Sequence, residues 1–175
     1  GECAVKTINA TLSSQSLEQM INELRAEETG LADKCRRLCS RLAEIGVSVV
    51  RTVYSVADYA GTNDAVVSFE VAQDGATIIA NGQSVAFIEF GTGVSYPLGE
   101  YAAQAGAPPH GSYGKGKGNQ KIWGYYGEQG TLGIPVKGRD GLYLTHGNPP
   151  ANAFPQAVET IKESFIRIAK EVFEA

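Results

Sequence analysis

The longest hydrophobic pattern in the sequence predicts helix through most of residues 12–58. An S-x-x-Q capping box begins at Ser16, and Thr29-Gly30 supplies a stop, so we expect a short first helix between them. The β-branched composition of residues 47–53 is typical of a strand, but Val49-Val50 breaks the alternation that a strand requires, which favours helix. The second, longer helix has apolar residues at spacings of three and four: Leu31, Cys35, Leu38, Leu42, Ile45, Val49, Val53 and Val56.

Residues 64–98 predict a β-hairpin followed by a short apolar segment. Apolar and polar residues alternate over 67–71, and Asp74-Gly75 is a typical hairpin turn. The octapeptide AFIEFGTG, residues 86–93, is too short for its pattern to distinguish a buried strand from a short helix. It places Glu89 inside an apolar run, so that carboxylate must point out of the core or be held by hydrogen-bond donors.

The glycine-rich part of the chain follows. Residues 99–120 show no periodicity and predict a long flexible excursion. Strands are expected to resume within residues 121–145, at KIWGYYG and GLYLT. Apolar spacings of three and four then predict a C-terminal helix over residues 152–174, with Asn152 as its N-cap and Pro155 in its first turn.

These elements predict a single α+β domain over residues 1–175. A long N-terminal helical segment and a C-terminal helix pack on a mostly antiparallel sheet, and the Gly-rich excursion projects from it. A hydrophobic content of 43% and a charged content of 19% are typical of globular proteins. A net charge of -4 gives no general attraction to nucleic acid, and no apolar run reaches the roughly 20 residues that cross a bilayer.

The three cysteines cannot all form intramolecular disulfides. Cys35 and Cys39 share a helix face, but the further ligands of a closed zinc site are missing from their neighbourhood. We therefore expect buried, reduced thiols, no metal and no other cofactor.

A phosphate-binding loop is suggested by GSYGKGKG, residues 111–118, and then contradicted by two features. The residue after Lys117 is glycine instead of Ser or Thr, and no apolar strand precedes the motif. We expect a flexible arm that carries Lys115 and Lys117. A nucleic-acid-binding module that uses these lysines with Trp123 and Tyr125 is an alternative, because basic and aromatic residues interleave there.

Catalysis has few candidate residues. A small hydrolase would use Glu89 with a histidine, either His110 or His146, beneath the Gly-rich segment as a lid. The spacing of these residues does not predict such a set, so we expect a protein that is not an enzyme.

Two short segments carry a resemblance to a known family. FIEFGTG, residues 87–93, and THGNPPANAFPQAV, residues 145–158, resemble the signatures of the tail-component family of long-tailed double-stranded DNA bacteriophages. The first is similar to an apolar–Glu–Phe–Gly–Thr motif after a hairpin, and the second to a Thr-x-Gly-x-Pro-Ala segment that leads into the last helix. The resemblance spans about Leu31 to the C-terminus. It departs from the family at Pro149-Pro150, which is doubled, and at His146, where relatives are often basic.

The resemblance implies a structural virion protein of the tail or neck, described in the family as a tail-completion or head–tail joining protein. Its expected partners are copies of itself in a ring, a hexamer by family expectation, and tail-tube or tail-terminator and head-completion proteins. The ring surrounds DNA that passes without specific binding, is assembled in the cytoplasm of a host bacterium, and has no membrane partner.

Glu89 has an architectural role in this interpretation. We expect it to accept hydrogen bonds from the 91–93 turn or from the chain entering the last helix, with Phe87, Ile88 and Phe90 packed beneath. The candidate structural and interface residues are Phe87, Glu89, Phe90, Gly91, Thr92, Trp123, His146, Gly147, Pro149 and Ala151.

Overall fold

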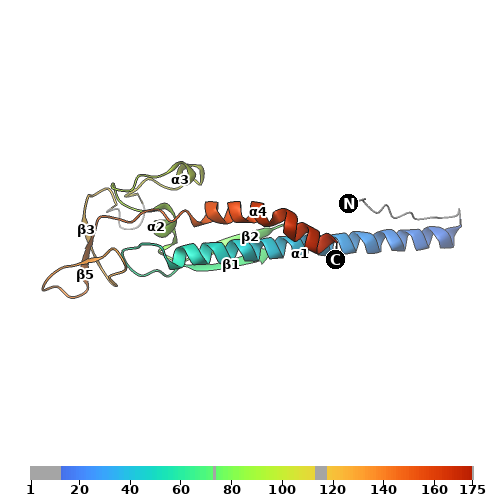
Figure 1. Cartoon of the computed structure of the whole chain (residues 1–175), viewed down its shortest axis with the longest axis horizontal. Helices are drawn as coiled ribbons and strands as arrows, with labels where there is room; N and C mark the ends of the chain where they lie inside the picture. Colours follow the sequence, from blue (N-terminus) through green and yellow to red (C-terminus); the bar gives the residue numbers. More distant parts are fainter. Residues whose placement is uncertain (1–12, 73, 113–117, 175) are drawn as a thin grey trace.

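The computed structural model describes residues 13–72, 74–112 and 118–174, and it has the predicted α+β architecture. The molecule is elongated, with one long helix along most of its length and a small sheet beyond one end of that helix (Figure 1). Its elements in chain order are α1 (Ser14–Ser55), β1 (Val66–Val71), β2 (Ala76–Asn81), α2 (Val85–Phe90), α3 (Glu100–Gln104), β3 (Trp123–Tyr126), β4 (Ile134–Pro135), β5 (Leu142–Thr145) and α4 (Ala153–Phe173).

The predicted break at Thr29-Gly30 is wrong, because α1 is one helix of 42 residues. Gly30 lies in open space, where an added Cβ would meet no atom within 4 Å, and the Thr29 hydroxyl donates to the Arg25 carbonyl oxygen at 2.9 Å. A lone glycine costs a helix only about 1 kcal/mol, which the rest of α1 offsets. The N-cap is Ser13 instead of Ser16: the Ser13 hydroxyl oxygen accepts from Ser16 N–H at 3.2 Å. The prediction of helix over residues 47–53 is confirmed.

The C-terminal half of α1 is the centre of the folded body. The helix α4 lies along it, and the β1–β2 hairpin covers another side (Figure 1). Gly46 permits this close packing, since a Cβ there would lie 2.4 Å from a methyl carbon of Ile78 on β2 and 2.8 Å from one of Ile161 on α4. The buried core joins all these elements and consists of Val47, Val50, Tyr54, Val67, Ile88, Ala153 and Ala157.

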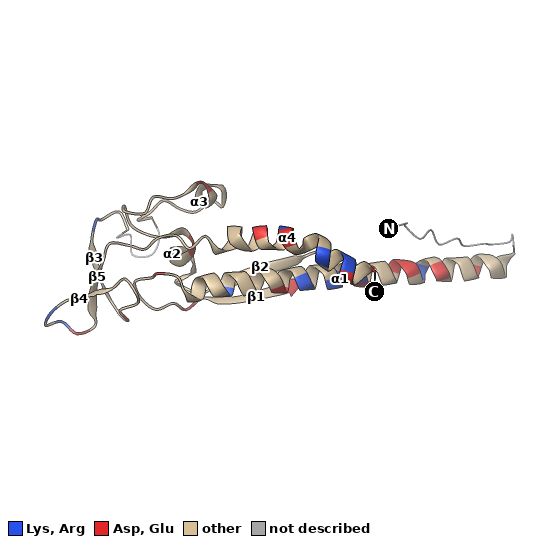
Figure 2. Ribbon diagram, viewed as in Figure 1, with Lys and Arg blue, Asp and Glu red and all other residues tan. Residues whose placement is uncertain are grey.

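The N-terminal half of α1 extends beyond this body (Figure 1). The helix α4 ends beside Lys34 of α1, whose ammonium donates a hydrogen bond to the Phe173 carbonyl oxygen at 3.2 Å. Residues 21–33 are all exposed, so no described part of the chain covers them. Figure 2 shows that acidic residues dominate this projecting part, while basic residues gather where it enters the body.

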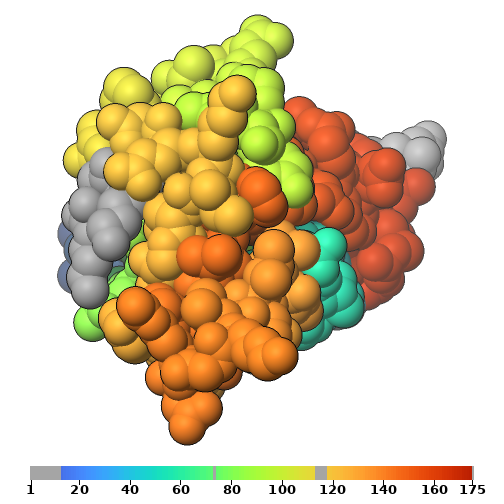
Figure 3. All heavy atoms as spheres, turned by 90° about the vertical axis from the view of Figure 1, so that its left-hand side faces the viewer, coloured from blue at the N-terminus to red at the C-terminus, as the bar shows by residue number. Residues whose placement is uncertain are grey.

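The strands form two separate antiparallel sheets. In the predicted hairpin, Val67 pairs with Ala80 and Phe69 with Ile78. The second sheet has the order β3-β5-β4 and pairs Trp123 with Thr145. It lies at the end of the molecule opposite the projecting helix, where the orange segments in Figure 3 form the surface.

The segment from 99 to 120 is not wholly irregular, as the sequence pattern suggested. Residues 100–104 form α3, and Ala102 is buried. The Tyr101 ring packs on the Phe90 ring of α2, with their centroids 5.8 Å apart. This aromatic contact anchors α3 on the body, a tertiary effect that local periodicity does not encode.

The cysteines differ in part from expectation. Cys35 and Cys39 are free, but Cys35 is exposed on α1 and Cys39 only half-buried. Cys35 is exposed because it lies on the part of α1 that α4 barely reaches. Among the helices of the described ranges, none has both the length and the apolar character needed to span a membrane.

Candidate functional site

The two segments singled out in the sequence, residues 87–93 and 145–158, pack against each other. Thr92 N–H donates to the Asn148 carbonyl oxygen at 2.9 Å, and Asn148 N–H donates to the Thr92 carbonyl oxygen at 3.2 Å. They form an antiparallel bridge outside the two sheets. Gly147 makes the approach possible, because it has a φ of +97° and a Cβ there would lie 2.0 Å from the Thr92 carbonyl oxygen. The two motifs are therefore one structural unit, which we call the motif junction (residues 87–93 with 145–154).

Glu89 lies at the centre of the motif junction with only 2% of its surface exposed. Its carboxylate accepts hydrogen bonds from Ala153 N–H at 2.9 Å and from Phe154 N–H at 3.1 Å. These are the first N–H groups of α4, which have no partner inside their own helix. Of the two donor sets predicted for Glu89, the chain entering the last helix is the correct one.

Asn152 occupies the predicted N-cap position but does not cap α4 with its side chain. Its backbone is left-handed, with a φ of 49°, and its side chain makes no capping hydrogen bond. Glu89 substitutes for it from a different helix. A carboxylate at this place also faces the positive end of the α4 dipole.

The connection between α2 and α4 is reciprocal. Ala151 N–H donates to the Ile88 carbonyl oxygen at 2.9 Å, and Asn152 N–H donates to the Glu89 carbonyl oxygen at 3.2 Å. The last carbonyl groups of α2 are thus satisfied by the same segment whose first helical N–H groups Glu89 satisfies. Gly91 ends α2 with a φ of 74°, and a Cβ there would lie 2.8 Å from the Asn148 carbonyl oxygen.

The hydroxyl groups of Tyr54 and Tyr101 both lie within the electrostatic influence of the Glu89 carboxylate. Burial raises the pKa of the Tyr54 hydroxyl far above its ordinary value, and the negative charge of Glu89 raises it further. The pKa of Tyr101 is raised by the same two causes in the same order. The Tyr54 hydroxyl is buried close to Glu89 but forms no hydrogen bond of acceptable geometry with the described residues. Both tyrosines thus stay neutral and add no charge to this region.

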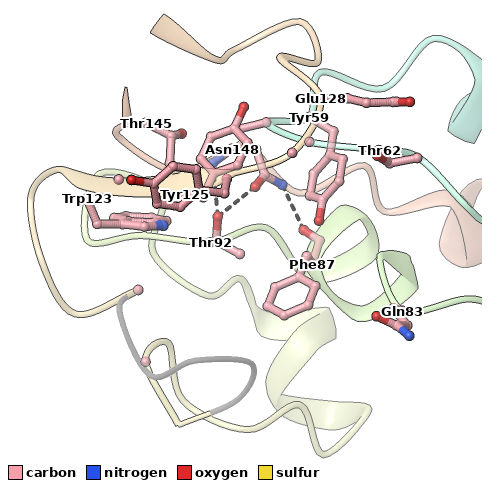
Figure 4. A pocket seen from close by; sticks show the side chains of 17 residues that line it. Tyr59, Thr62, Gln83, Phe87, Thr92, Trp123, Tyr125, Glu128, Thr145 and Asn148 are labelled. Atoms are coloured by element: carbon pink, nitrogen blue, oxygen red, sulfur yellow. Dashed lines mark hydrogen bonds between the residues drawn. The ribbon is translucent and has the colours of Figure 1, made fainter. Parts of the chain in front are cut away.

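Asn148 is a buried polar residue that sequence reasoning missed. It is 1% exposed, its amide nitrogen donates to the Phe87 carbonyl oxygen at 2.7 Å, and its amide oxygen accepts from the Thr92 hydroxyl at 2.6 Å (Figure 4). The side chain therefore fastens the second motif to α2 and to the turn after it. The family-like segment THGNPP contains this residue, but an asparagine between Gly and Pro is more typical of an exposed turn.

The other predicted site residues surround the motif junction. The Trp123 ring lies against Gly93, where a Cβ would come within 3.2 Å of its Cη2 atom. His146 is exposed, and its Nδ1 lies 3.1 Å from the Lys121 carbonyl oxygen. Pro149 is half-buried in the chain that leads to α4. These residues support the position of the second sheet relative to α2.

A pocket of about 500 Å³ opens beside the motif junction (Figure 4). Its volume lies within the range of small-molecule sites. Aromatic rings and backbone of several loops form its walls, and the labelled polar residues lie between them. The side chains that line it include Tyr59, Thr62, Gln83, Phe87, Thr92, Trp123, Tyr125, Tyr126, Glu128, Thr145 and Asn148.

The described lining of this pocket carries one carboxylate, the exposed Glu128, and no histidine. Glu89 is not part of the lining, since its carboxylate is used by α4. His110 faces backbone, with Nδ1 3.0 Å from the Gly93 carbonyl oxygen. Within the described residues, Glu89 forms its hydrogen bonds with the start of α4 and not with His110 or His146. The same part of the chain contains no group of three or more His, Cys, Asp or Glu side chains that could hold a metal.

A second carboxylate arrangement, also missed from the sequence, lies at the other end of α2. Asp64 accepts from Ser84 N–H at 2.8 Å, from the Ser84 hydroxyl at 2.5 Å and from Gln83 N–H at 2.8 Å. These hydrogen bonds, that of the Ser84 hydroxyl above all, lower the pKa of Asp64 to about 2. Asp64 and Glu89 therefore fix the two ends of the same short helix. The sequence GTND indicated only a turn.

Comparison of the chain with family models, with curated proteins and with solved structures finds no match. Lys115 and Lys117, which the flexible-arm and nucleic-acid interpretations use, lie outside the described residues. Trp123 and Tyr125, predicted with them, both line the pocket.

Proposed function

We propose that this protein is a non-enzymatic structural component of the tail or neck of a long-tailed bacteriophage. In this role it completes the end of the tail or joins the tail to the head, as a ring of identical copies around the DNA channel. Tail-tube or tail-terminator proteins and head-completion proteins are its partners. Assembly takes place in the cytoplasm of the host bacterium.

The motif junction carries this proposal. The family-like segments 87–93 and 145–158 are identified from sequence alone, and they are hydrogen-bonded to each other through Thr92, Asn148 and Glu89. Because the two segments form one structural unit, there is a physical reason for both to occur in one chain and in this order. The buried carboxylate caps a helix here, which is a structural role and leaves it unavailable as a general base.

The surface of the molecule is consistent with an assembly protein. Large apolar side chains are exposed along both α1 and α4, and apolar surface of this kind marks places where proteins associate. The projecting part of α1 is also acidic, as Figure 2 shows, and a negative surface lets DNA pass a channel without being held.

Co-assembly with phage components tests the proposal. The protein is mixed with the tail-tube and head-completion proteins encoded beside its gene, and the products are measured by native mass spectrometry and electron microscopy. We expect closed rings, six copies by family expectation, that attach to the end of tail tubes. Absence of any complex with these partners, together with tails that are complete without the protein, would overturn the proposal.

A further inference from the structure

The projecting part of α1 carries an uncovered apolar stripe, which consists of Leu17, Ile21, Leu24 and Leu31. These residues are between 40 and 57% exposed. Their spacings of four, three and seven place them on one side of the helix with a heptad repeat. The repeat continues into Leu38, Leu42 and Ile45, which are half-buried in the part of α1 that α4 covers.

One charged residue interrupts the α1 stripe. Glu28 occupies the heptad position between Leu24 and Leu31. A carboxylate in the middle of an apolar contact is unfavourable unless a positive group meets it. A partner of this stripe should therefore be apolar and should carry a cation at one matching position.

The helix α4 has an outer apolar face that consists of Val158, Phe165, Ile166 and Phe173. These residues are between 38 and 63% exposed. Ile166 and Phe173 lie on a different side of α4 from Ile168, which is buried in the body. Val158 and Phe165 share a heptad spacing with the buried Val172 and therefore form the edge of the outer face. Two charged residues interrupt this outer face: the exposed Lys162 and, three residues earlier, Glu159, with which it forms a surface ion pair at 2.8 Å.

We propose that the α1 stripe of one copy packs antiparallel against the α4 outer face of a second copy, with Glu28 opposite Lys162. In this register Leu24 lies opposite Ile166, four residues away from the Glu28–Lys162 pair. Eleven residues from it, Leu17 meets Phe173. The aligned parts, 17–31 and 159–173, are each 15 residues long, about 22 Å of helix. At one end Leu31 lies opposite the exposed Glu159, which keeps its ion pair with Lys162.

The charges beside this contact also match. In an antiparallel pair of helices, the flanking positions just after the heptad core residues face each other. This register pairs Glu18 with Lys170 and Arg25 with Glu163. Two further pairs of opposite charge thus coincide with the one at Glu28 and Lys162, which gives the register a charge complementarity that favours the right partner.

The parallel alignment fits less well. With Glu28 opposite Lys162 in that direction, Leu17 falls opposite residue 151, before α4 begins at Ala153. Phe173 would then lie opposite residue 39, close to where Arg41 already binds Glu171 of the same copy's α4. In the antiparallel register every residue of the α1 stripe lies opposite a residue of α4, and only residues 153–158 of the neighbour's α4 extend beyond Leu31 towards Lys34.

The contact continues an interface that already exists within one copy. On α1, the heptad positions after Leu31 are covered by α4 of the same copy. In the proposed contact, the heptad positions of α1 before Leu31 are covered by α4 of the neighbouring copy. The two surfaces of the contact are different, so each copy offers both and the association is head-to-tail. Such contacts close into rings or extend into filaments, and this inference rests on the self-assembly in the proposed function.

Charge reversal at the central pair tests the contact. E28K places like charges opposite each other in every contact between identical copies, and so does K162E. We expect each variant alone to associate at least about tenfold more weakly than the wild type in sedimentation velocity. An equimolar mixture restores association, because E28K and K162E copies present opposite charges to each other in both directions.

Two controls make the result specific. E23K changes the same charge on α1 outside the stripe and should associate like the wild type. In a chain whose native cysteines are replaced by serine, L24C with I166C should form disulfide-linked copies, whereas L24C with V158C, the parallel register, should not. Circular dichroism melts that match the wild type show that the variants are folded.

The inference is overturned if the wild type stays monomeric up to about 1 mM, or if the E28K and K162E mixture associates no better than each variant alone. These outcomes are distinct from failure of the proposed function. A chain that forms this contact but never attaches to tail components keeps the interface and loses the phage role. If the chain attaches to tail components and neither E28K nor K162E weakens that attachment, the phage role is kept and the proposed contact between copies is lost.

Discussion

Glu89 accepts a hydrogen bond from the backbone N–H of Phe154, 65 positions further along the sequence. Glu89, near the end of the short helix α2, thereby caps the beginning of the long helix α4. The left-handed Asn152 cannot supply this acceptor itself. One buried carboxylate thus helps to fix the beginning of α4 against α2.

Replacing Glu89 by glutamine should lower the free energy of unfolding by about 1–3 kcal/mol, because one of the two α4 N–H groups loses its acceptor. Glu89→Ala should lower it further, since both lose it and a cavity forms. Urea unfolding measures the difference. Glu159→Gln on the exposed side of α4 is the control and should stay within about 0.5 kcal/mol of the wild type. Equal stability of all four proteins would exclude the capping role.

Removing the Tyr54 hydroxyl should not destabilise the protein. That hydroxyl is buried without a hydrogen bond of acceptable geometry, so Tyr54→Phe removes a desolvated polar group and keeps the ring. We expect the free energy of unfolding to be unchanged or higher by up to about 1 kcal/mol. Tyr126→Phe at an exposed position serves as the reference. A loss of more than about 1 kcal/mol in Tyr54→Phe would mean that the hydroxyl is bonded to Glu89.

Asp64 should make stability depend on acid. Its pKa is lowered from an ordinary value of 3.8 to about 2 in the folded state by the hydrogen bonds of Ser84 and Gln83. A lowered folded-state pKa gives stability that is fully present above the unfolded pKa and is lost as pH falls towards the folded one. The melting temperature should therefore fall between about pH 4 and pH 2, and Asp64→Asn should flatten that part of the curve.

Gly147 tests the close approach of the two motifs. Gly147→Ala places a Cβ 2.0 Å from the Thr92 carbonyl oxygen, whereas Gly138→Ala, also at positive φ, meets no atom within 4 Å. Both substitutions carry the backbone strain of about 1–2 kcal/mol, and only the first adds a clash. We expect Gly147→Ala to lose at least about 2 kcal/mol more in chemical unfolding. A similar loss of unfolding free energy at both positions would mean that the motif junction accommodates the added Cβ by a small shift of the backbone.

The buried, hydrogen-bonded state of Glu89 could be predicted because the residues beside it in the sequence are apolar. A carboxylate in the run FIEF has few alternatives to hydrogen-bonded burial, and the chain entering α4 offered unpaired N–H groups. The helices over residues 31–56 and 152–174, and the hairpin, were equally visible because their apolar periodicities extend over several turns or strand residues.

Other features depend on contacts that local sequence does not contain. Thr29-Gly30 has the composition of a helix end, but helix continues because the sequence on both sides has the same heptad repeat. Asn148 and Asp64 look like turn residues, and only the arrival of Thr92 and Ser84 from elsewhere gives them buried or charged roles. The short helix α3 exists through the contact of Tyr101 with Phe90.

The pairing of α1 with α4 has a consequence during synthesis. Arg41 and Glu171, which join these helices, are 130 positions apart in the chain. At ordinary translation rates, roughly ten to twenty seconds pass between their appearance at the ribosome. During this interval the β1–β2 hairpin can already pack on α1, but the side of α1 that α4 covers lacks its native partner until α4 emerges. A ribosome that stops before residue 153 releases a product whose core cannot close.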